Sequence, residues 1–276
     1  MSDPVSARIG RQRTDTDVLS ERLVASFVAT LDPFLASSDP GQAPLCAHWC
    51  LVPPLTRTVD LKADGHPPLD DFLPPCDLPR RMWAGGEIEF GQPLAVGETV
   101  ERRSTFDSIS EKEGKSGRLR FVAMRHELAG ASGGYVTERQ DIVYLPASRP
   151  EAAPRADLGE AADCDLAWEV EATTSLLFRY SALTFNSHRI HYDLPYACNE
   201  EGLPGLLVHG PLQATLLANL AAALAQGRPK RFVYRAVSPL VAGGIFRAKA
   251  RREGSDIACW TESGTGTVTM TGKAFW

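Results

Sequence analysis

The chain has 276 residues, of which 43% are hydrophobic and 23% are charged, a composition typical of a globular protein with one large domain or two of ordinary size. A net charge of −5 argues against the basic surface that nucleic acid binding requires. The sequence contains no run of about 18 apolar residues, and its first residues lack the apolar core of a secretory signal. We therefore expect a cytoplasmic protein that contacts neither membrane nor nucleic acid.

The first half of the chain begins with an expected helix and continues into a long proline-rich stretch. Residues 18–36 carry apolar side chains at three- and four-residue steps as far as Pro33, which predicts an amphipathic helix. Prolines then recur from Ala43 to Pro79, so we expect an extended path over the surface there rather than regular structure. Because this stretch is long for a loop, we expect it to have a functional role.

A meander of strands is expected next. From Gly85 to Leu145, short β-type runs alternate with glycine-containing turns, which predicts antiparallel pairing, with residues 121–124 in a central strand. Residues 147–163 are rich in Pro, Ala and charge, show no periodicity, and predict a linker. The linker divides the chain into a first half, residues 1–146, and a second half, residues 164–276.

The second half contains one clear helix. Residues 209–227 place leucines at four-residue steps on one stripe, fill the other faces with alanine, and end at Gly227. A helix that is apolar on all sides is expected to be wrapped by other structure, most simply by a curled sheet. Alternating runs follow it to the C-terminus. A buried helix followed by a meander favours a hotdog-like unit, two of them per chain.

Residues 177–197, LFRYSALTFNSHRIHYDLPYA, hold the densest cluster of reactive side chains. Asn186, His188, His191 and Asp193 can each act as an acid, a base or a water-binding group. Histidine is the side chain whose ordinary pKa suits both proton uptake and release near neutrality. A single histidine is more often a structural residue, but three of the six histidines fall between His188 and His209. The cluster therefore indicates a catalytic site.

The segment SALTFNSHRIHYD resembles the hydratase motif of MaoC-like and R-specific enoyl-CoA hydratases. His191 occupies the position of the catalytic histidine, and Asn186 occupies that of the catalytic aspartate. His188 and Arg189 stand where the motif usually has Asn-Pro. These departures resemble a narrower branch of fused double-hotdog proteins, which includes itaconyl-CoA and mesaconyl-C4-CoA hydratases and type 2 3-hydroxyacyl-thioester dehydratases. MWAGGEIEF and GLPGLLVHGPLQATLLANL resemble the same branch, so the similarity spans almost the whole chain.

The resemblance implies an α+β double hotdog, with two curved antiparallel sheets that each wrap around a central helix. It implies a catalytically degenerate first half that shapes the acyl pocket, and a second half that carries the motif. The implied substrate is a CoA or acyl-carrier thioester. We expect no cofactor and no metal, and we expect a homodimer.

Roles follow from the resemblance and from side-chain chemistry. His191 is the expected general acid–base group, and Gly210, at the start of the apolar helix, the expected oxyanion donor. Asn186 has no acid–base pair near neutrality but can hold a water. His191 is therefore expected to handle both proton transfers. The alternative is that Asp193 or His188 supplies a second acid–base function, although Asp193 is more readily interpreted as a residue that bonds to backbone or orients His191. The residues expected to bind substrate are Tyr180, His188, Arg189 and His209.

The favoured function is reversible hydration of an enoyl-CoA with a short branched acyl group derived from a dicarboxylate, such as mesaconyl-C4-CoA or itaconyl-CoA. The first alternative is a 3-hydroxyacyl-thioester dehydratase of fatty acid metabolism, and the second is a hotdog thioesterase, because one fold supports several chemistries. A non-catalytic subunit and a metal-dependent hydrolase built on His188, His191 and Asp193 are weaker alternatives.

Overall fold

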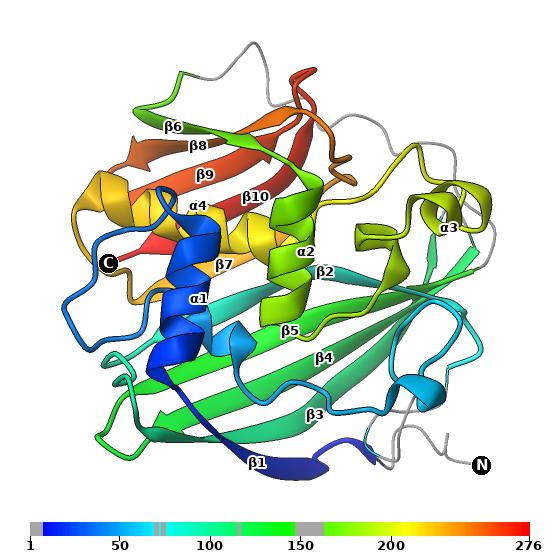
Figure 1. Cartoon of the computed structure of the whole chain (residues 1–276), viewed down its shortest axis with the longest axis horizontal. Coiled ribbons are helices and arrows are strands. Elements are labelled where there is room, and N and C mark those ends of the chain that lie inside the picture. Colours follow the sequence, from blue (N-terminus) through cyan, green and yellow to red (C-terminus); the bar gives the residue numbers. More distant parts are fainter. Residues whose placement is uncertain (1–7, 69–71, 73–75, 115–116, 147–162) are drawn as a thin grey trace.

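Ten strands form one continuous antiparallel sheet in the computed structural model, which describes residues 8–68, 72, 76–114, 117–146 and 163–276 (Figure 1). The strand order is β1-β3-β4-β5-β2-β7-β10-β9-β8-β6, so strands of the first half occupy one side of the sheet and those of the second half the other. The strands are β1 (Gln12–Val18), β2 (Arg80–Phe90), β3 (Thr99–Gly114), β4 (Gly117–Gly130), β5 (Tyr135–Leu145), β6 (Leu166–Glu171), β7 (Arg231–Ala236), β8 (Ile245–Glu253), β9 (Asp256–Glu262) and β10 (Val268–Phe275).

The two sides of the sheet join where β2 pairs with β7, from Gly85 opposite Arg235 to Glu89 opposite Arg231. The glycine pair of β2 permits this close approach. A Cβ at Gly85 would lie 2.5 Å from the Tyr234 carbonyl oxygen, and one at Gly86 would lie 2.4 Å from a backbone carbonyl oxygen of β5. The glycines of MWAGGEIEF therefore hold the two halves in one sheet.

The apolar helix expected in the second half is confirmed as α4 (Gly210–Ala225), which is buried along most of its length and packs across β7 to β10 and β6 (Figure 1). Leu212, Leu217 and Leu220 are each fully buried. The helix ends where Gln226 adopts a left-handed conformation before Gly227. This arrangement, a helix in the concavity of a curved antiparallel sheet, is the hotdog unit.

In the first half, α1 (Glu21–Leu31) lies beside α2 (Thr174–Leu183) and contacts the short 3-10 helix η2 (Ala47–Cys50) (Figure 1). The proline-rich stretch differs from its expected surface path at residues 43–51, which include 3-10 turn η2 and belong to the core. Apolar side chains there remove their surface from water, and the Trp49 indole donates to the buried Glu138 carboxylate of β5 at 2.8 Å. Residues further along, around η3 (Thr58–Asp60), are exposed as expected.

Except for Asp163, the expected linker lies outside the described residues. On its two sides, residues 1–146 contain β1 to β5, and residues 164–276 contain β6 to β10, α2, α4 and α3 (Leu194–Asn199). None of the helices in the described parts of the chain is long and apolar enough to span a membrane.

Candidate active site

The motif segment leaves α2 through a tight, hydrogen-bonded turn. Phe185 has a positive φ of 50°, which directs the chain back so that the Asn186 N–H donates to the Ser181 carbonyl at 2.8 Å. The Asn186 side-chain oxygen then accepts from the His188 N–H at 3.0 Å, a bond typical of turns. The 3-10 helix η4 (Arg189–His191) follows directly. The side-chain oxygen of Asn186 therefore shapes the loop, and its NH₂ group is the part that can hold a water.

His191 is buried and held in one tautomer. Its Nδ1 lies 2.8 Å from the Leu207 carbonyl oxygen, which can only accept, so Nδ1 carries the proton and Nε2 is the acceptor. Burial lowers the pKa of His191 to about 4, and therefore the ring is neutral at pH 7. A neutral imidazole with an available Nε2 is the form in which histidine acts as a general base.

His209 stacks on His191, with ring centroids 3.7 Å apart and an interplanar angle of 18°. It is the residue before α4, its Nε2 lies 2.8 Å from the Ser181 hydroxyl, and burial together with His191 holds its pKa well below the usual range. Tyr180 lies against the ring of His209 with its centroid 5.1 Å away, and only 1% of it is exposed. This placement favours a packing role for Tyr180 over the expected substrate contact.

Gly210 is the first residue of α4, so its N–H has no carbonyl partner within the helix and lies at the positive end of the helix dipole. A Cβ at this position would meet only Met270 at 3.9 Å and Trp83 at 4.0 Å, which are ordinary contacts. Packing alone therefore does not demand glycine here. The N–H of Gly210, which has no partner within α4, and the lack of a bulky side chain agree with the expected oxyanion role.

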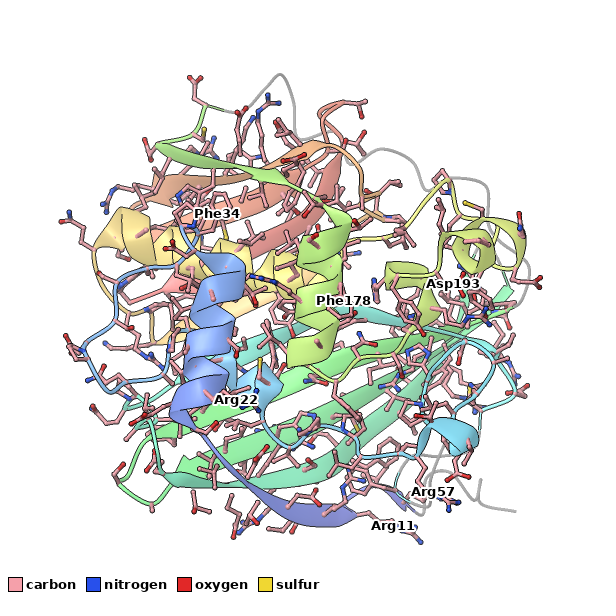
Figure 2. The ribbon with its side chains drawn as sticks, in the orientation of Figure 1. Arg11, Arg22, Phe34, Arg57, Phe178 and Asp193 are labelled. Atoms are coloured by element: carbon pink, nitrogen blue, oxygen red, sulfur yellow. The ribbon has the colours of Figure 1, made fainter. Side chains whose placement is uncertain are left out.

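Asp193 and Arg189 bond mainly to each other and to backbone. Figure 2 shows Asp193 just before α3. One of its oxygens accepts from the Tyr196 N–H, and the other accepts two hydrogen bonds from the Arg189 guanidinium at 2.8 and 3.0 Å. These bonds lower the pKa of Asp193 and give no support to its expected catalytic role. Arg189 also lies over the Tyr196 ring at 3.9 Å and donates to the Ala63 carbonyl. Both side chains line a surface hollow of about 380 Å³.

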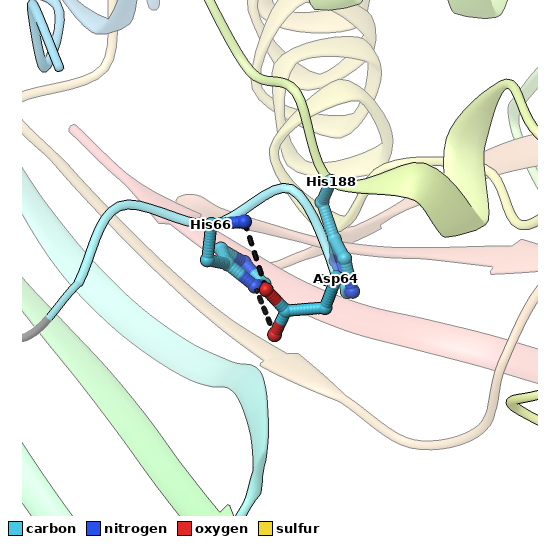
Figure 3. A group of neighbouring side chains, drawn as sticks. All are labelled: Asp64, His66 and His188. Carbon is cyan, nitrogen blue, oxygen red and sulfur yellow. Dashed lines mark hydrogen bonds and ion pairs between the residues drawn. The ribbon is translucent and has the colours of Figure 1, made fainter. Parts of the chain in front are cut away.

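Two residues of the proline-rich stretch complete the group and were not identified from the sequence. The His66 ring lies 4.0 Å from the His188 ring, and His66 Nδ1 lies 3.1 Å from an Asp64 oxygen (Figure 3). His188 in turn makes an edge contact with His191 at 5.5 Å. The only sequence signal was the length of the loop, because nothing in the pattern relates residue 66 to residue 188.

Asp64, His66 and His188 offer ligand atoms within 4.8 Å of one another and are the types that bind transition metals. The set weighed from the sequence, His188, His191 and Asp193, is not of this kind, because Arg189 and a backbone N–H occupy the Asp193 carboxylate.

The chain matches known proteins over most of its length. The family model described as hydroxyacyl-thioester dehydratase type 2 matches residues 46–242. A mesaconyl-C(4)-CoA hydratase of Chloroflexus aurantiacus is 38% identical over 91% of this chain and 90% of its own. A mitochondrial hydroxyacyl-thioester dehydratase type 2 of Schizosaccharomyces pombe is 27% identical over 80% of both chains.

Solved structures show the same fold at low sequence identity. A MaoC-like dehydratase from Phytophthora capsici superposes with a TM-score of 0.70 at 16% identity, covering 99% of this chain and 98% of its own. A double-hotdog protein of Mycobacterium tuberculosis superposes with a TM-score of 0.54 at 15% identity, covering 96% and 95%. The expected α+β double hotdog is thereby confirmed. The expectation of two separate sheets is wrong, because the pairing of β2 with β7 joins both halves in one sheet.

Two hotdog halves in one chain, with a buried histidine stacked on the residue that precedes α4, define a double-hotdog protein. The sequence match is more specific than this class. The chain belongs to the hydroxyacyl-thioester dehydratase type 2 family. The relatives named above are a hydratase and a dehydratase, and the chain is an enzyme of the same hydro-lyase class.

Proposed function

We propose that the protein catalyses the reversible addition of water to an enoyl-CoA with a short, branched acyl group derived from a dicarboxylate. The tautomer of His191 carries this proposal, because its bond to Leu207 presents Nε2 as a base close to the start of α4. The 38% identity to a mesaconyl-C(4)-CoA hydratase supports this choice of acyl group.

The chemistry follows from three groups. His191 Nε2 takes a proton from a water while the water oxygen adds to Cβ of the enoyl group. The double-bond electrons move onto Cα and the thioester carbonyl, and the Gly210 N–H and the α4 dipole stabilise the resulting enolate oxygen. The Asn186 amide holds the water. A proton added to Cα completes the hydration, and the reverse sequence is the dehydration.

The test uses purified protein with crotonyl-, mesaconyl-, itaconyl- and longer enoyl-CoA and with the corresponding hydroxyacyl-CoA, with products identified by mass. A gain or loss of one water supports the proposal. His191→Asn keeps a side-chain N–H that can reach the Leu207 carbonyl but removes Nε2, so we expect turnover to fall on the order of 10²- to 10⁴-fold with the fold intact. A variant that retains wild-type turnover would overturn the assignment of His191.

The same panel separates the alternatives. A preference for long hydroxyacyl substrates would indicate a dehydratase of fatty acid metabolism, and release of free CoA without hydration would indicate a thioesterase. We further propose that the enzyme is a cytoplasmic homodimer that uses no cofactor or metal. Size-exclusion chromatography with light scattering tests the dimer, cell fractionation tests the compartment, and activity after chelator treatment tests the metal.

A further inference from the structure

The loop that carries Asp64 and His66 is anchored on the catalytic motif, although more than a hundred residues separate them in the chain. The Arg189 N–H donates to the Asp64 carbonyl at 2.9 Å, and the Ser187 hydroxyl donates to the Gly65 carbonyl at 2.6 Å. The Arg189 guanidinium donates to the Ala63 carbonyl at 2.9 Å. Three consecutive residues of the first half are thus bonded to Ser187 and Arg189 beside His191, so this loop is part of the site.

Asp64 and His66 form an oriented pair within that loop. The Asp64 carboxylate accepts from the His66 N–H at 2.9 Å through one oxygen, and its other oxygen lies 3.1 Å from His66 Nδ1. An ionised carboxylate can only accept, so Nδ1 carries the proton and Nε2 faces away from Asp64. Each side chain is a little under one-fifth exposed. A histidine whose Nδ1 is held by a carboxylate is an arrangement suited to proton transfer at Nε2.

The hydration reaction has a role for a group of this kind. One proton leaves the water and another enters Cα, and the two transfers occur at different atoms of the substrate. The Asn186 amide cannot shuttle a proton, and the Asp193 carboxylate is occupied by Arg189 and the Tyr196 N–H. The His188 ring contacts both the His66 ring, at 4.0 Å, and the His191 ring, at 5.5 Å, so it links the two histidines. Figure 3 shows Asp64, His66 and His188 at one end of this group.

We propose that His66, held by Asp64, is the second acid–base group of the site and donates the proton that Cα receives. The inference rests on the proposed hydratase function. The step balances as follows. His191 gains the proton of the attacking water, and His66, which enters the step with a proton on both ring nitrogens, loses its Nε2 proton to the enolate carbon. One water has then been added across the double bond. Proton exchange with solvent returns both histidines to their starting forms. In the dehydration direction His66 removes the proton from Cα.

The same three side chains could also be read as a metal site, because Asp64, His66 and His188 lie close enough to share an ion. The surrounding positive charges disfavour a metal ion. The Lys62 ammonium lies 3.9 Å from the Asp64 oxygen that contacts His66, and the positive charge of Arg81 acts on His188. A divalent cation placed here would be repelled by both of these groups.

The experiment compares wild type with His66→Ala, Asp64→Asn and a control, Val59→Ala, whose side chain is 84% exposed earlier in the same stretch. We expect His66→Ala to lower kcat on the order of 10²-fold with KM changed less than threefold, and Asp64→Asn to lower it about tenfold. Added imidazole should raise the kcat of His66→Ala at least tenfold and should leave the kcat of Asp64→Asn unchanged. Val59→Ala should match wild type.

A deuterium readout isolates the proton transfer. Wild type incubated with the hydroxyacyl-CoA in D₂O should incorporate deuterium at Cα, and His66→Ala should lose this exchange in proportion to kcat. The proposal is overturned if His66→Ala keeps kcat within threefold of wild type, or if its loss resists imidazole and is matched by a lower melting temperature. Loss of wild-type activity on chelation, restored by Zn²⁺, overturns it in favour of a metal. A wild type that hydrates no thioester overturns the proposed function itself.

Discussion

Replacement of Gly65 by alanine tests whether the first half builds the catalytic site. Gly65 has a φ of +87°, and a Cβ there would lie 1.9 Å from the Ser187 carbonyl oxygen. An L-residue in a left-handed conformation costs about 1–2 kcal/mol, and a clash with backbone that cannot yield adds about 1–3 kcal/mol. Gly41→Ala is the matched control, because its φ is +80° and no atom of the described residues lies within 4 Å of its Cβ position.

We expect Gly65→Ala to strain or release the docked loop and to lower activity. If the loop stays docked, the free energy of unfolding measured in urea falls by about 2–5 kcal/mol, against about 1–2 kcal/mol for Gly41→Ala. If the loop releases instead, global stability changes less, but the Arg189 amide, which donates to the Asp64 carbonyl, exchanges faster with solvent. In the first case kcat falls because the backbone beside Asp64 and His66 must shift to clear the Ser187 carbonyl, and in the second because both side chains leave the site.

The reasoning would be refuted by a Gly65→Ala variant with the unfolding free energy of Gly41→Ala, unchanged exchange at Arg189 and wild-type kcat. Such a result would mean that the contact with Ser187 is not part of the native site.

Three further predictions concern stability. The pKa of His191 is about 4 in the folded protein and 6.5 in the unfolded chain, so between these pH values the unfolded chain binds one more proton. The contribution of His191 to stability is therefore fully present above pH 6.5 and falls by about 1.4 kcal/mol per pH unit towards pH 4. Urea titrations at several pH values measure the slope of the unfolding free energy against pH, and in His191→Asn this slope should be smaller by the contribution of one proton, about 1.4 kcal/mol per pH unit. An unchanged slope would contradict a buried, neutral His191 ring. Asp193→Ala should cost about 1 kcal/mol through the lost cap of α3, whereas Asp193→Asn, which still accepts from Tyr196, should cost less; equal losses would argue against capping. Leu217→Ala, at a fully buried position of α4, should cost about 2–5 kcal/mol, and a loss below 1 kcal/mol by calorimetry would place the helix outside the core.

Local patterns in the sequence were sufficient for the central elements. The leucine and alanine pattern of residues 209–227 predicted α4 and its burial, because a helix that is apolar on every face must be covered on every face. The cluster around His191 was recognised from the density of reactive side chains on one short segment, and the roles of its members from the family resemblance. The meander of the first half was likewise readable from alternating runs and turns.

Tertiary structure decided what depends on contacts between distant segments. Proline content predicted a surface path for residues 43–51, but burial of their apolar side chains against β5 and its neighbours outweighs the lack of regular structure. Asp193 follows the motif histidine in the sequence, and only the bonds with Arg189 and the start of α3 show that its oxygens are occupied. His66 has no local pattern around it, because its relation to His188 arises from a loop of one half docking on the other. The sequence therefore determined the elements and the motif, and the packing of the two halves determined which side chains meet there.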